Sequence, residues 1–485
     1  MRKPCDSDIG ATSGAPIGDE LMTEVIQEKI PARIDRSSIH KIIQDSDHTH
    51  AKIAVCDIDG VLRGKQITKE KLYGAIEHGV GFSDVILGWD IKDTLYTGSK
   101  LSSWDTGYGD VPVLIDACSA RIDPSDDNML LFMGEIGGRL RHVCPRSLLK
   151  RVIERTERNG AVAKVACEYE FVVFDETPST IREKQFKNLQ PYSWSVQAYS
   201  LLEASLRKDM FSEIVETCQK MALPVEGIHP ESGAGVYEVA LAHSDALNAA
   251  DAATLVKMVV KSLVRKKGKL ATFMPKLSIN QPGQGAHIHV SLAAFDGSPI
   301  FYDHDAPSHI GASMLNFIGG IQALIPDFIC MTVPTINGFK RLAPDFWAPT
   351  NCEWGIENRT CGIRVIGDKP GSLHIEFRIS GGDINPYIAI SAVLAAGIWG
   401  IEHRIEPRPA VVGNAYSIDQ DPSIKLPVTM DEALRRFRAS AVANELFGEA
   451  FVEHFAFSRE WELNQYTQHM ANVSQWELDR YMENI

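Results

Sequence analysis

The chain has 485 residues, 44% of them hydrophobic, which is enough apolar material for two or three soluble globular domains. Its formal net charge of −14 argues against a sequence-independent nucleic-acid binder, which needs a basic surface to displace counterions from phosphates. A small-molecule partner is therefore expected, and no nucleic acid.

The N-terminal part is expected to hold a leader and a small domain. Residues 1–40 are predicted to be a partly disordered leader, because Met1–Gly18 is polar and lacks the charged-then-apolar layout of a signal peptide. The apolar stretch Ala51–Val61 predicts a strand and turn that open an N-terminal domain over residues 41–143. Within that domain, Gly79–Asp110 is rich in Gly, Trp, Tyr and Asp without a sustained period, so we predict a long functional loop.

A second domain is predicted over residues 144–485. Pro145 begins a helical pattern, and a longer amphipathic helix is predicted between Asp245 and Gly268. The longest apolar stretch, Tyr387–Ile401, is shorter than a membrane span and is interpreted as a buried helix, so no membrane partner is expected.

Cysteine usage bears on the compartment. The nine cysteines are scattered with no CxxC pair, so the sequence suggests neither a zinc site nor a disulfide framework. Such usage is typical of a reducing compartment, and we expect a cytoplasmic protein.

A pair of glutamates lies on one predicted strand. The segment Val165–Asp175 reads as a buried strand, so Glu168 and Glu170, two residues apart, point to the same face. Burial of two neighbouring carboxylates raises both pKa values unless a positive charge lies beside them. The pair therefore needs a divalent cation or an arginine.

The same spacing recurs twice. It places His287 and His289 on one strand face, and Glu376 and Arg378 on another. Together with Glu231 and Glu238, the chain offers five carboxylates and a histidine, a ligand set suited to Mg²⁺ or Mn²⁺. Each pair alone is as well explained by a solvated strand face, but their conjunction favours phosphate chemistry. Four arginines that follow are typical of sites that grip anions, although each alone is more often a surface ion-pair partner: Arg341, Arg359, Arg364 and Arg378.

These residues lie in an ordered series of motifs that closely resembles the glutamine synthetase family. The series comprises CEYEF at 167–171, HPESGAGVYE at 229–238, ATFMPK at 271–276, GAHIHVSL at 285–292, NGFKRL at 337–342, ENR at 357–359, IEFR at 375–378 and NPY at 385–387. The resemblance covers Pro145 to the C-terminus and, more weakly, Lys52 to Leu114.

The resemblance implies a role for each site residue. Two or more divalent ions per site are implied, Mg²⁺ or Mn²⁺, with ATP as co-substrate. The implied ligands are Glu170, Glu231 and Glu238 for one ion and Glu168, His287 and Glu376 for the second. The implied ATP-binding residues are His289, Ser291, Arg359 and Arg364, and the implied glutamate-binding residues are Gly283, Arg341 and Arg378. Arg341 and Arg359, with Asp90, match catalytic positions of the family.

The resemblance also implies a fold and an assembly. The expected α+β fold has a small N-terminal β-grasp domain and a large α/β catalytic domain with an incomplete antiparallel barrel. We expect a homododecamer of two stacked hexamers, in which a neighbour's N-terminal domain completes each active site. The implied reaction moves the γ-phosphoryl group of ATP onto the side-chain carboxylate of glutamate, and an amine then displaces phosphate.

Four positions depart from the family pattern. Where ammonia-using members have a glutamate that deprotonates the ammonium, this chain has Trp347. An indole accepts no proton, but it offers an apolar wall or a cation–π face to an organic amine. The usual Gly-Gln before Glu238 is Gly-Val here, and the usual Asn-Gly before the HxH strand is Pro-Gly. His374 replaces a usual arginine.

Three aspartates are candidates for the ammonium site that the resemblance implies. Asp90 is the best candidate, and Asp93 and Asp105 compete with it. Aromatic residues of the same loop are expected either to line an amine pocket or to pack between subunits: Trp89, Tyr96, Trp104 and Tyr108.

Three functions remain open from the sequence. The first is a ligase that forms a γ-glutamyl amide from glutamate and an organic amine, such as a polyamine, an alkylamine or an arylamine. The second is glutamine synthetase proper, which uses ammonia. The third is a non-catalytic structural member of the fold, which has no need to keep all six metal-ligand positions. The choice between the first two depends mainly on Trp347, which is expected to form the amine pocket together with Asp90.

Overall fold

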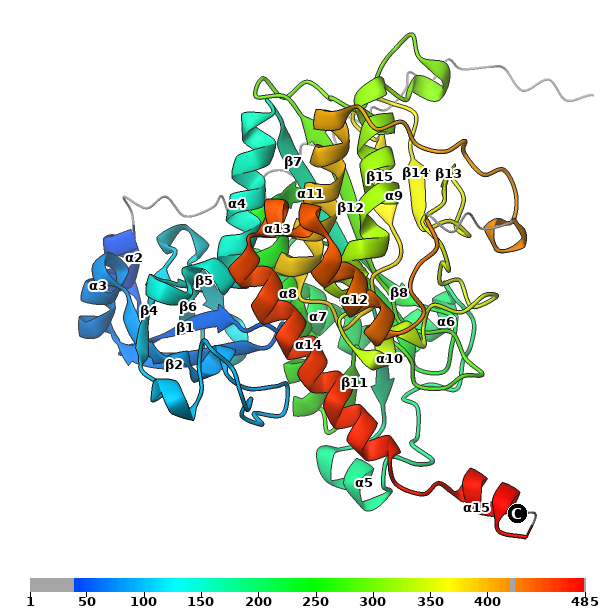
Figure 1. Cartoon of the computed structure of the whole chain (residues 1–485). Helices are drawn as coiled ribbons and strands as arrows, with labels where there is room; N and C mark the ends of the chain where they lie inside the picture. The colour runs from blue at the N-terminus through cyan, green and yellow to red at the C-terminus, as the bar shows by residue number, and fades with distance from the viewer. Residues whose placement is uncertain (1–38, 419–423, 484–485) are drawn as a thin grey trace, which may run out of the picture. The chain divides into compact units, whose positions relative to one another are not determined.

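The computed structural model describes residues 39–418 and 424–483, so the predicted leader lies outside the described residues except for its last two positions. The described residues form two β-sheets accompanied by helices (Figure 1). The predicted domain boundary near residue 143 falls between the two sheets, because the last strand of the first sheet ends at Ile136 and the first strand of the second begins at Val162.

The first sheet has six strands in the order β2-β1-β6-β4-β3, with β5 paired to β6. Its strands are β1 (His50–Cys56), β2 (Leu62–Thr68), β3 (Val80–Ser83), β4 (Asp110–Ile115), β5 (Arg121–Asp123) and β6 (Met129–Ile136). Strands β1 and β6 pair in parallel and the other pairs are antiparallel. Helix α2 (Ile39–Asp45) precedes β1 in the chain, and α3 (Lys69–His78) lies between β2 and β3.

The prediction of one long loop over Gly79–Asp110 is wrong at its start. Strand β3 pairs with β4 there and buries Val80 and Phe82. Four residues that include a glycine are too short to show the alternation by which a strand is recognised in a sequence.

The second sheet has nine strands in the order β13-β14-β15-β12-β7-β9-β8, with β10 and β11 also paired to β7. Its strands are β7 (Val162–Phe174), β8 (Val225–Pro230), β9 (Val236–Leu241), β10 (Ser244–Asp245), β11 (Leu270–Thr272), β12 (Ala286–Ala293), β13 (Trp354–Ile356), β14 (Ile363–Ile366) and β15 (His374–Phe377). Strands β13 and β14 pair in parallel and the other pairs are antiparallel.

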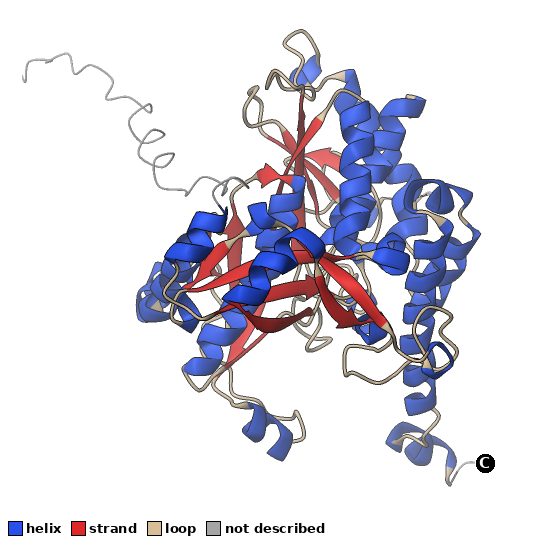
Figure 2. Ribbon diagram, turned by 90° about the vertical axis from the view of Figure 1, so that its left-hand side faces the viewer, coloured by secondary structure: helices blue, strands red, loops and turns tan. Residues whose placement is uncertain are grey.

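Helices cover one face of this sheet, as the two ribbon views show (Figures 1 and 2). The helices that follow the first sheet are α4 (Pro145–Arg158), α5 (Pro178–Glu183), α6 (Leu201–Leu206), α7 (Lys208–Lys220), α8 (Ala246–Lys266), α9 (Ala312–Thr332), α10 (Ile336–Phe339), α11 (Pro386–His403), α12 (Met430–Ala439), α13 (Ala441–Phe447), α14 (Glu449–Met470) and α15 (Gln475–Tyr481). Helices α4 and α8 pack on β7, and α11 packs on α4, α8 and α9. The helices predicted after Pro145, after Asp245 and at Tyr387–Ile401 are confirmed as α4, α8 and α11.

Close packing of α9 and α11 depends on two glycines. A Cβ atom at Gly320 would lie 2.7 Å from the Cα of Gly400, so neither position has room for a side chain. Helix α9 is long and apolar enough to cross a membrane by length and composition, but 78% of its most apolar window is buried inside the protein.

The side chains of strand β7 alternate between the helix-covered face of the sheet and a polar face. Tyr169 and Phe171 are fully buried and contact Phe273, whereas Glu168 and Glu170 alternate with them and point the other way. The polar face of the second sheet is therefore the place to examine for a functional site.

Candidate active site

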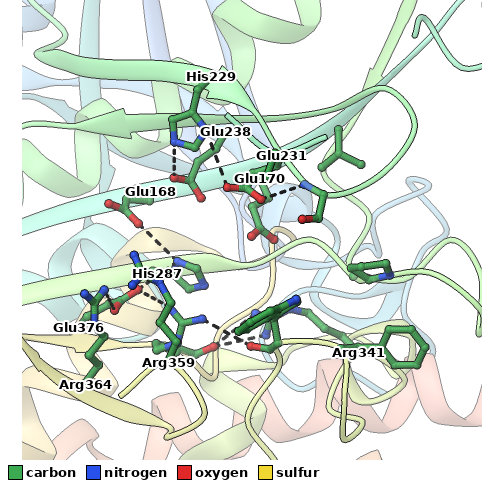
Figure 3. A pocket seen from close by; sticks show the side chains of 18 of the residues that line it. Glu168, Glu170, His229, Glu231, Glu238, His287, Arg341, Arg359, Arg364 and Glu376 are labelled. Atoms are coloured by element: carbon green, nitrogen blue, oxygen red, sulfur yellow. Dashed lines mark hydrogen bonds and ion pairs between the residues drawn. The ribbon is translucent and has the colours of Figure 1, made fainter. Parts of the chain in front are cut away.

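A cavity of about 640 Å³ lies on this polar face (Figure 3). Its lining residues are Glu168, Glu170, Ala198, Tyr199, His229, Glu231, Ser232, Val236, Glu238, Pro282, Gly283, His287, His289, Arg341, Phe346, Trp347, Arg359, Arg364, Ile366, Glu376 and Arg378. The structure thus brings together all six residues predicted as metal ligands with the four predicted arginines, Gly283, His289 and Trp347.

Strand register explains why these side chains meet. Glu168 on β7 lies opposite His287 on β12, and Glu170 lies opposite Glu238 on β9. Glu376 on β15 lies opposite His289 on β12. Residues paired across neighbouring strands project from the same face, so pairs far apart in sequence share one side of the sheet.

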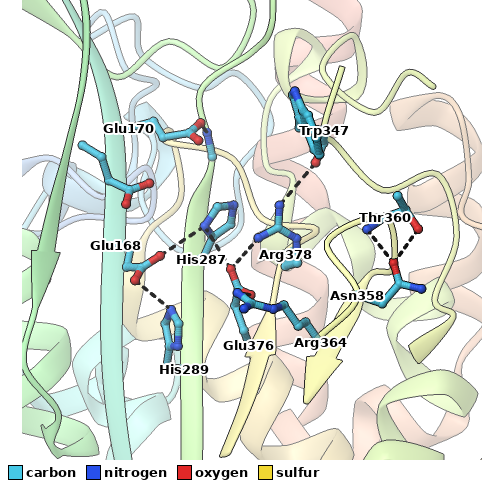
Figure 4. Close-up of polar contacts among 12 residues, drawn as sticks. Glu168, Glu170, His287, His289, Trp347, Asn358, Thr360, Arg364, Glu376 and Arg378 are labelled. Carbon is cyan, nitrogen blue, oxygen red and sulfur yellow. Dashed lines mark hydrogen bonds and ion pairs between the residues drawn. The ribbon is translucent and has the colours of Figure 1, made fainter. Parts of the chain in front are cut away.

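Two histidines and two glutamates form one tight group (Figure 4). The His287 Nδ1 lies 3.4 Å from a carboxylate oxygen of Glu168 and 3.4 Å from one of Glu376, and the His289 Nε2 lies 3.3 Å from the second oxygen of Glu168. Burial alone would raise the pKa of Glu168, but hydrogen bonds with the two histidines hold that pKa well below its ordinary value. Burial is likewise outweighed at Glu376, where His287 and Arg378 lower the pKa to about 2.

A second acidic group surrounds His229 (Figure 3). The His229 Nε2 lies 3.2 Å from a carboxylate oxygen of Glu238, and its Nδ1 lies 3.8 Å from one of Glu231. Burial and the nearby charges of Glu170 and Glu238 raise the pKa of Glu231, so these carboxylates gain from a cation placed between them. Glu170 accepts a hydrogen bond from the backbone N–H of Gly285.

Three groups of side chains in the described residues could each hold a metal ion, because their ligand atoms lie within 4.8 Å of one another. They are Glu168, Glu238 and His287; Glu168, His289 and Glu376; and His229, Glu231 and Glu238. Carboxylate oxygens, which form the majority of these donors, suit Mg²⁺ and Mn²⁺. The two ligand sets implied by the resemblance share members with these groups without coinciding with them, so the division of ligands between ions stays a proposal.

Arginines form the opposite wall, from β14, β15 and the loops beside them (Figures 3 and 4). Arg378 pairs with Glu376 at 2.5 Å, and Arg364 pairs with Glu376 at 3.2 Å and with Glu357. Arg341 is 3% exposed and donates to the backbone carbonyl of Ile379 at 3.0 Å. No carboxylate in the described ranges lies within ion-pair distance of Arg341, which therefore suits an anionic ligand.

His374, which replaces an arginine of the family pattern, contacts His289. The His374 Nδ1 lies 2.6 Å from the carbonyl oxygen of Ser372 and must donate to it, so in the neutral ring Nε2 is an acceptor. That acceptor lies 3.1 Å from the Nδ1 of His289. The Nδ1 of His289 therefore donates to His374. Burial alone would lower the pKa of His289, but the hydrogen bond of its Nε2 with Glu168 raises that pKa, which favours the doubly protonated ring.

Trp347 lies at the edge of the cavity and is 57% exposed. Its φ of +60° places it in the left-handed region, and its backbone carbonyl accepts a hydrogen bond from Arg378 at 3.5 Å. The indole is therefore presented beside the arginine wall and remains accessible to a ligand.

Two predicted site residues do not line this cavity. Ser291 lies farther along β12, on the same strand face as His289. Asp90 accepts hydrogen bonds from the backbone N–H groups of Lys92 and Thr94 and from the indole of Trp461. Of the competing aspartates, Asp93 pairs with Arg63, and neither it nor Asp105 lines the cavity.

The aromatic residues near Asp90 do not form an amine pocket within one chain. Tyr96 is 1% exposed and packs against Phe457 and Trp461, whereas Trp104 is 75% exposed. None of the four aromatics proposed for this role lines the cavity.

Comparison with known proteins identifies the family. A family model described as the catalytic domain of glutamine synthetase matches residues 142–481. The chain belongs to the glutamine synthetase family. Members generally use divalent metal ions and ATP, with glutamate and an amine or ammonia as substrates, and the three acidic groups of this cavity fit such ions.

Relatives in the glutamine synthetase family carry different activities in their names. Type-1 glutamine synthetase 2 of Dictyostelium discoideum is 36% identical over 431 residues, covering 87% of this chain and 82% of the relative. A glutamate–isopropylamine ligase of a Pseudomonas species is 34% identical, and the match covers 85% of this chain and 91% of the relative. The γ-glutamylethanolamide synthetase GlnA4 of Streptomyces coelicolor is 31% identical, and the match covers 88% of this chain and 92% of the relative.

Solved structures confirm the predicted fold class. The GmaS/ADP complex in its conformation 1 superimposes with a TM-score of 0.79 at 24% identity, covering 92% of this chain and 99% of that one. The curled nine-stranded sheet corresponds to the incomplete barrel expected of the glutamine synthetase fold.

Sequence reasoning missed His229 and the contact of His374 with His289. His229 and Glu231 have the same i, i+2 spacing as the pairs that were found, but Gly227 and Pro230 obscure the strand pattern. The contact between His374 and His289 depends on the pairing of β12 with β15, which no local pattern reveals.

Proposed function

We propose that this protein is an ATP-dependent ligase that forms a γ-glutamyl amide from glutamate and an organic amine. The observation that carries the proposal is Trp347, an accessible indole at the edge of an acidic cavity where ammonia-using relatives are expected to have a glutamate. Two relatives support it, one named for its substrate isopropylamine and one named for its γ-glutamylethanolamide product.

Each wall of the cavity has a proposed task. Glu170, Glu231 and Glu238 would hold one divalent ion, and Glu168, His287 and Glu376 the second. Such ions, when bound, would offset the negative charge of ATP phosphates and of the substrate carboxylate. The geometric groups around His229 and His289 add these two histidines to the candidate ligands.

The arginines and the backbone would position the substrates. Arg341 and Arg378, with Gly283, would bind glutamate, and Arg359 and Arg364, with His289, would face the phosphates of ATP. A Cβ atom at position 283 would lie 2.4 Å from the Pro275 carbonyl oxygen and 2.8 Å from the Cγ of Arg341, so only glycine leaves room for Arg341 there.

The proposed reaction has two steps. The γ-phosphoryl group of ATP passes to the side-chain carboxylate of glutamate, and ADP leaves. The amine nitrogen then attacks the carbonyl carbon of the acyl phosphate, phosphate departs with the electrons of the broken C–O bond, and the nitrogen loses a proton. Guanidinium groups stabilise the oxygens on which negative charge develops.

Two further parts of the proposal concern assembly and compartment. We propose a cytoplasmic homododecamer in which Asp90, which does not line the cavity of its own chain, reaches the cavity of a neighbour. Ser291 is proposed to contact the nucleotide at the far end of β12.

Glutamine synthetase proper is the second candidate, because the Dictyostelium relative of that name is 36% identical and several archaeal relatives of that name match at 30–32%. It requires a different group to accept the proton from ammonium.

The test exchanges Trp347 for the carboxylate that the family pattern contains. An amine substituent that buries about 60 Å² on the indole gains about 1.5 kcal/mol, or about tenfold in affinity. Trp347→Glu should therefore lower the ratio of kcat/KM for ethylamine to that for ammonium at least about tenfold. Trp476→Glu, an exchange at a comparably exposed indole on α15, is the matched control and should leave the ratio unchanged. An unchanged ratio in Trp347→Glu would refute the assignment.

A further inference from the structure

A second cavity, of about 330 Å³, adjoins the acidic one. Ser232, Val236 and Pro282 line both cavities, so the two cavities adjoin at these three residues. The walls come from β7, from the turn between β8 and β9, and from two loops, residues 184–199 and 273–285.

The two cavities differ sharply in charge. Five carboxylates, four arginines and three histidines line the first, whereas the lining of the second contains no Asp, Glu, Lys, Arg or His. Apolar side chains dominate the second, and the largest of them are Phe174, Phe186, Leu189, Trp194 and Leu277. Such a surface favours carbon over water, because burial of apolar area is worth about 25 cal/mol per Å².

One buried polar group in the second cavity has no partner. Gln284 is 2% exposed, and its side-chain carbonyl oxygen accepts no hydrogen bond from any described residue. A buried acceptor without a donor is costly unless a ligand or water supplies one. Gln284 follows Gly283, which lines the acidic cavity, so the N–H of an amine placed where the cavities adjoin is a suitable donor.

We propose that the apolar cavity holds the outer part of the carbon substituent of the acceptor amine, beyond the part that contacts the indole of Trp347, and that the preferred acceptors are primary monoamines with an aryl or branched alkyl group. This inference rests on the proposed function and names its substrate class. A cavity of about 150 Å³ is enough for one benzene ring, so the observed volume accommodates an aryl group with a short linker. A polyamine fits poorly, because its distal ammonium finds no carboxylate in this cavity.

The experiment compares kcat/KM for 2-phenylethylamine, methylamine, 1,4-diaminobutane and ammonium, with glutamate, ATP and Mg²⁺ held constant. The wild type should prefer 2-phenylethylamine to methylamine and to the diamine by about tenfold or more. Leu277→Glu, at a wall position that is 39% exposed, should lower the ratio for 2-phenylethylamine over methylamine about tenfold and raise the ratio for the diamine over methylamine.

Ile279→Glu is the matched control. Ile279 lies two residues away on the same loop, is 78% exposed and does not line the cavity, so this variant should keep the wild-type ratios. Phosphate release with methylamine but no preference for 2-phenylethylamine, or equal effects of both variants, would overturn this inference and leave the proposed function standing. Phosphate release with ammonium alone would instead overturn the proposed function.

A neighbouring copy of the chain is the rival occupant, because Phe186 and Trp194 are 66% and 72% exposed at the edge of the cavity. The native mass of each variant distinguishes this case. Loss of the wild-type assembly in Leu277→Glu, but not in Ile279→Glu, would show that the cavity is an interface and would also overturn the inference.

Discussion

Arg341 should bind a carboxylate of glutamate at a cost to the stability of the ligand-free protein. Its guanidinium is 3% exposed, its Nε has no hydrogen-bond partner within residues 39–418 and 424–483, and Arg378 lies beside it with the same charge. Burial lowers the pKa of Arg341, which shows that the surroundings disfavour its charge when no anion is present.

The replacement Arg341→Met keeps the length of the side chain and removes the cation. A hydrogen bond to a charged group is worth about 1.5–3 kcal/mol, so the KM for glutamate should rise about 10- to 100-fold. Because exchange of a buried charge for an apolar side chain is often stabilising, the melting temperature of the ligand-free protein should rise. Excess glutamate should raise the melting temperature of the wild type more than that of the variant.

Steady-state phosphate release at varied glutamate and a thermal melt with and without glutamate supply both measurements. Arg435→Met, at a 70% exposed side chain on α12, is the control and should change neither quantity. An unchanged KM together with a lower melting temperature would show that Arg341 is a structural residue and refute this reasoning.

Three other predictions follow from the same structure. Glu231→Ala should abolish turnover and reduce the stabilisation of the protein by Mg²⁺ or Mn²⁺ in a thermal melt; wild-type turnover would refute the assignment of this carboxylate to a metal site. Burial and the nearby charge of Arg459 lower the pKa of His454 to about 4. The neutral imidazole therefore contributes to the stability of the folded protein in full above about pH 6.5, and this contribution is lost as the pH falls toward 4. Between pH 7.5 and pH 5, the free energy of unfolding measured with urea should therefore fall by about 2 kcal/mol less in His454→Leu than in the wild type. Equal decreases in the two proteins would contradict this assignment. Mixed assemblies of Asp90→Ala and Arg341→Ala subunits should recover activity that neither parent has, and failure with mixing proved by native mass would contradict an active site shared between subunits.

Alternation along strands accounts for most of the site that the sequence predicted. Glu168 with Glu170, and His287 with His289, share a strand face because side chains alternate, and this rule needs no tertiary information. The fold class depended on the family motifs, because no local pattern reveals that β12 lies between β7 and β15.

Features formed by contacts between distant segments could not be predicted. The apolar cavity combines β7 with loops near Leu189 and Leu277, and its character arises only when these loops lie together. Asp90 was placed near an ammonium site by its motif alone, and within one chain it instead accepts a hydrogen bond from Trp461 of α14. Short strands such as β3 also lack the length that periodicity requires.

The central claim is that this protein prefers an organic amine to ammonium as the acceptor. Incubation of the wild type with glutamate, ATP, Mg²⁺ and equal concentrations of ammonium and 2-phenylethylamine, followed by mass spectrometry of the products, tests it directly. The account predicts that the γ-glutamyl amide of the organic amine predominates and that its formation matches the phosphate released. Glutamine as the main product, there and in competition with every other amine of a broad panel, would contradict the claim and identify the protein as a glutamine synthetase.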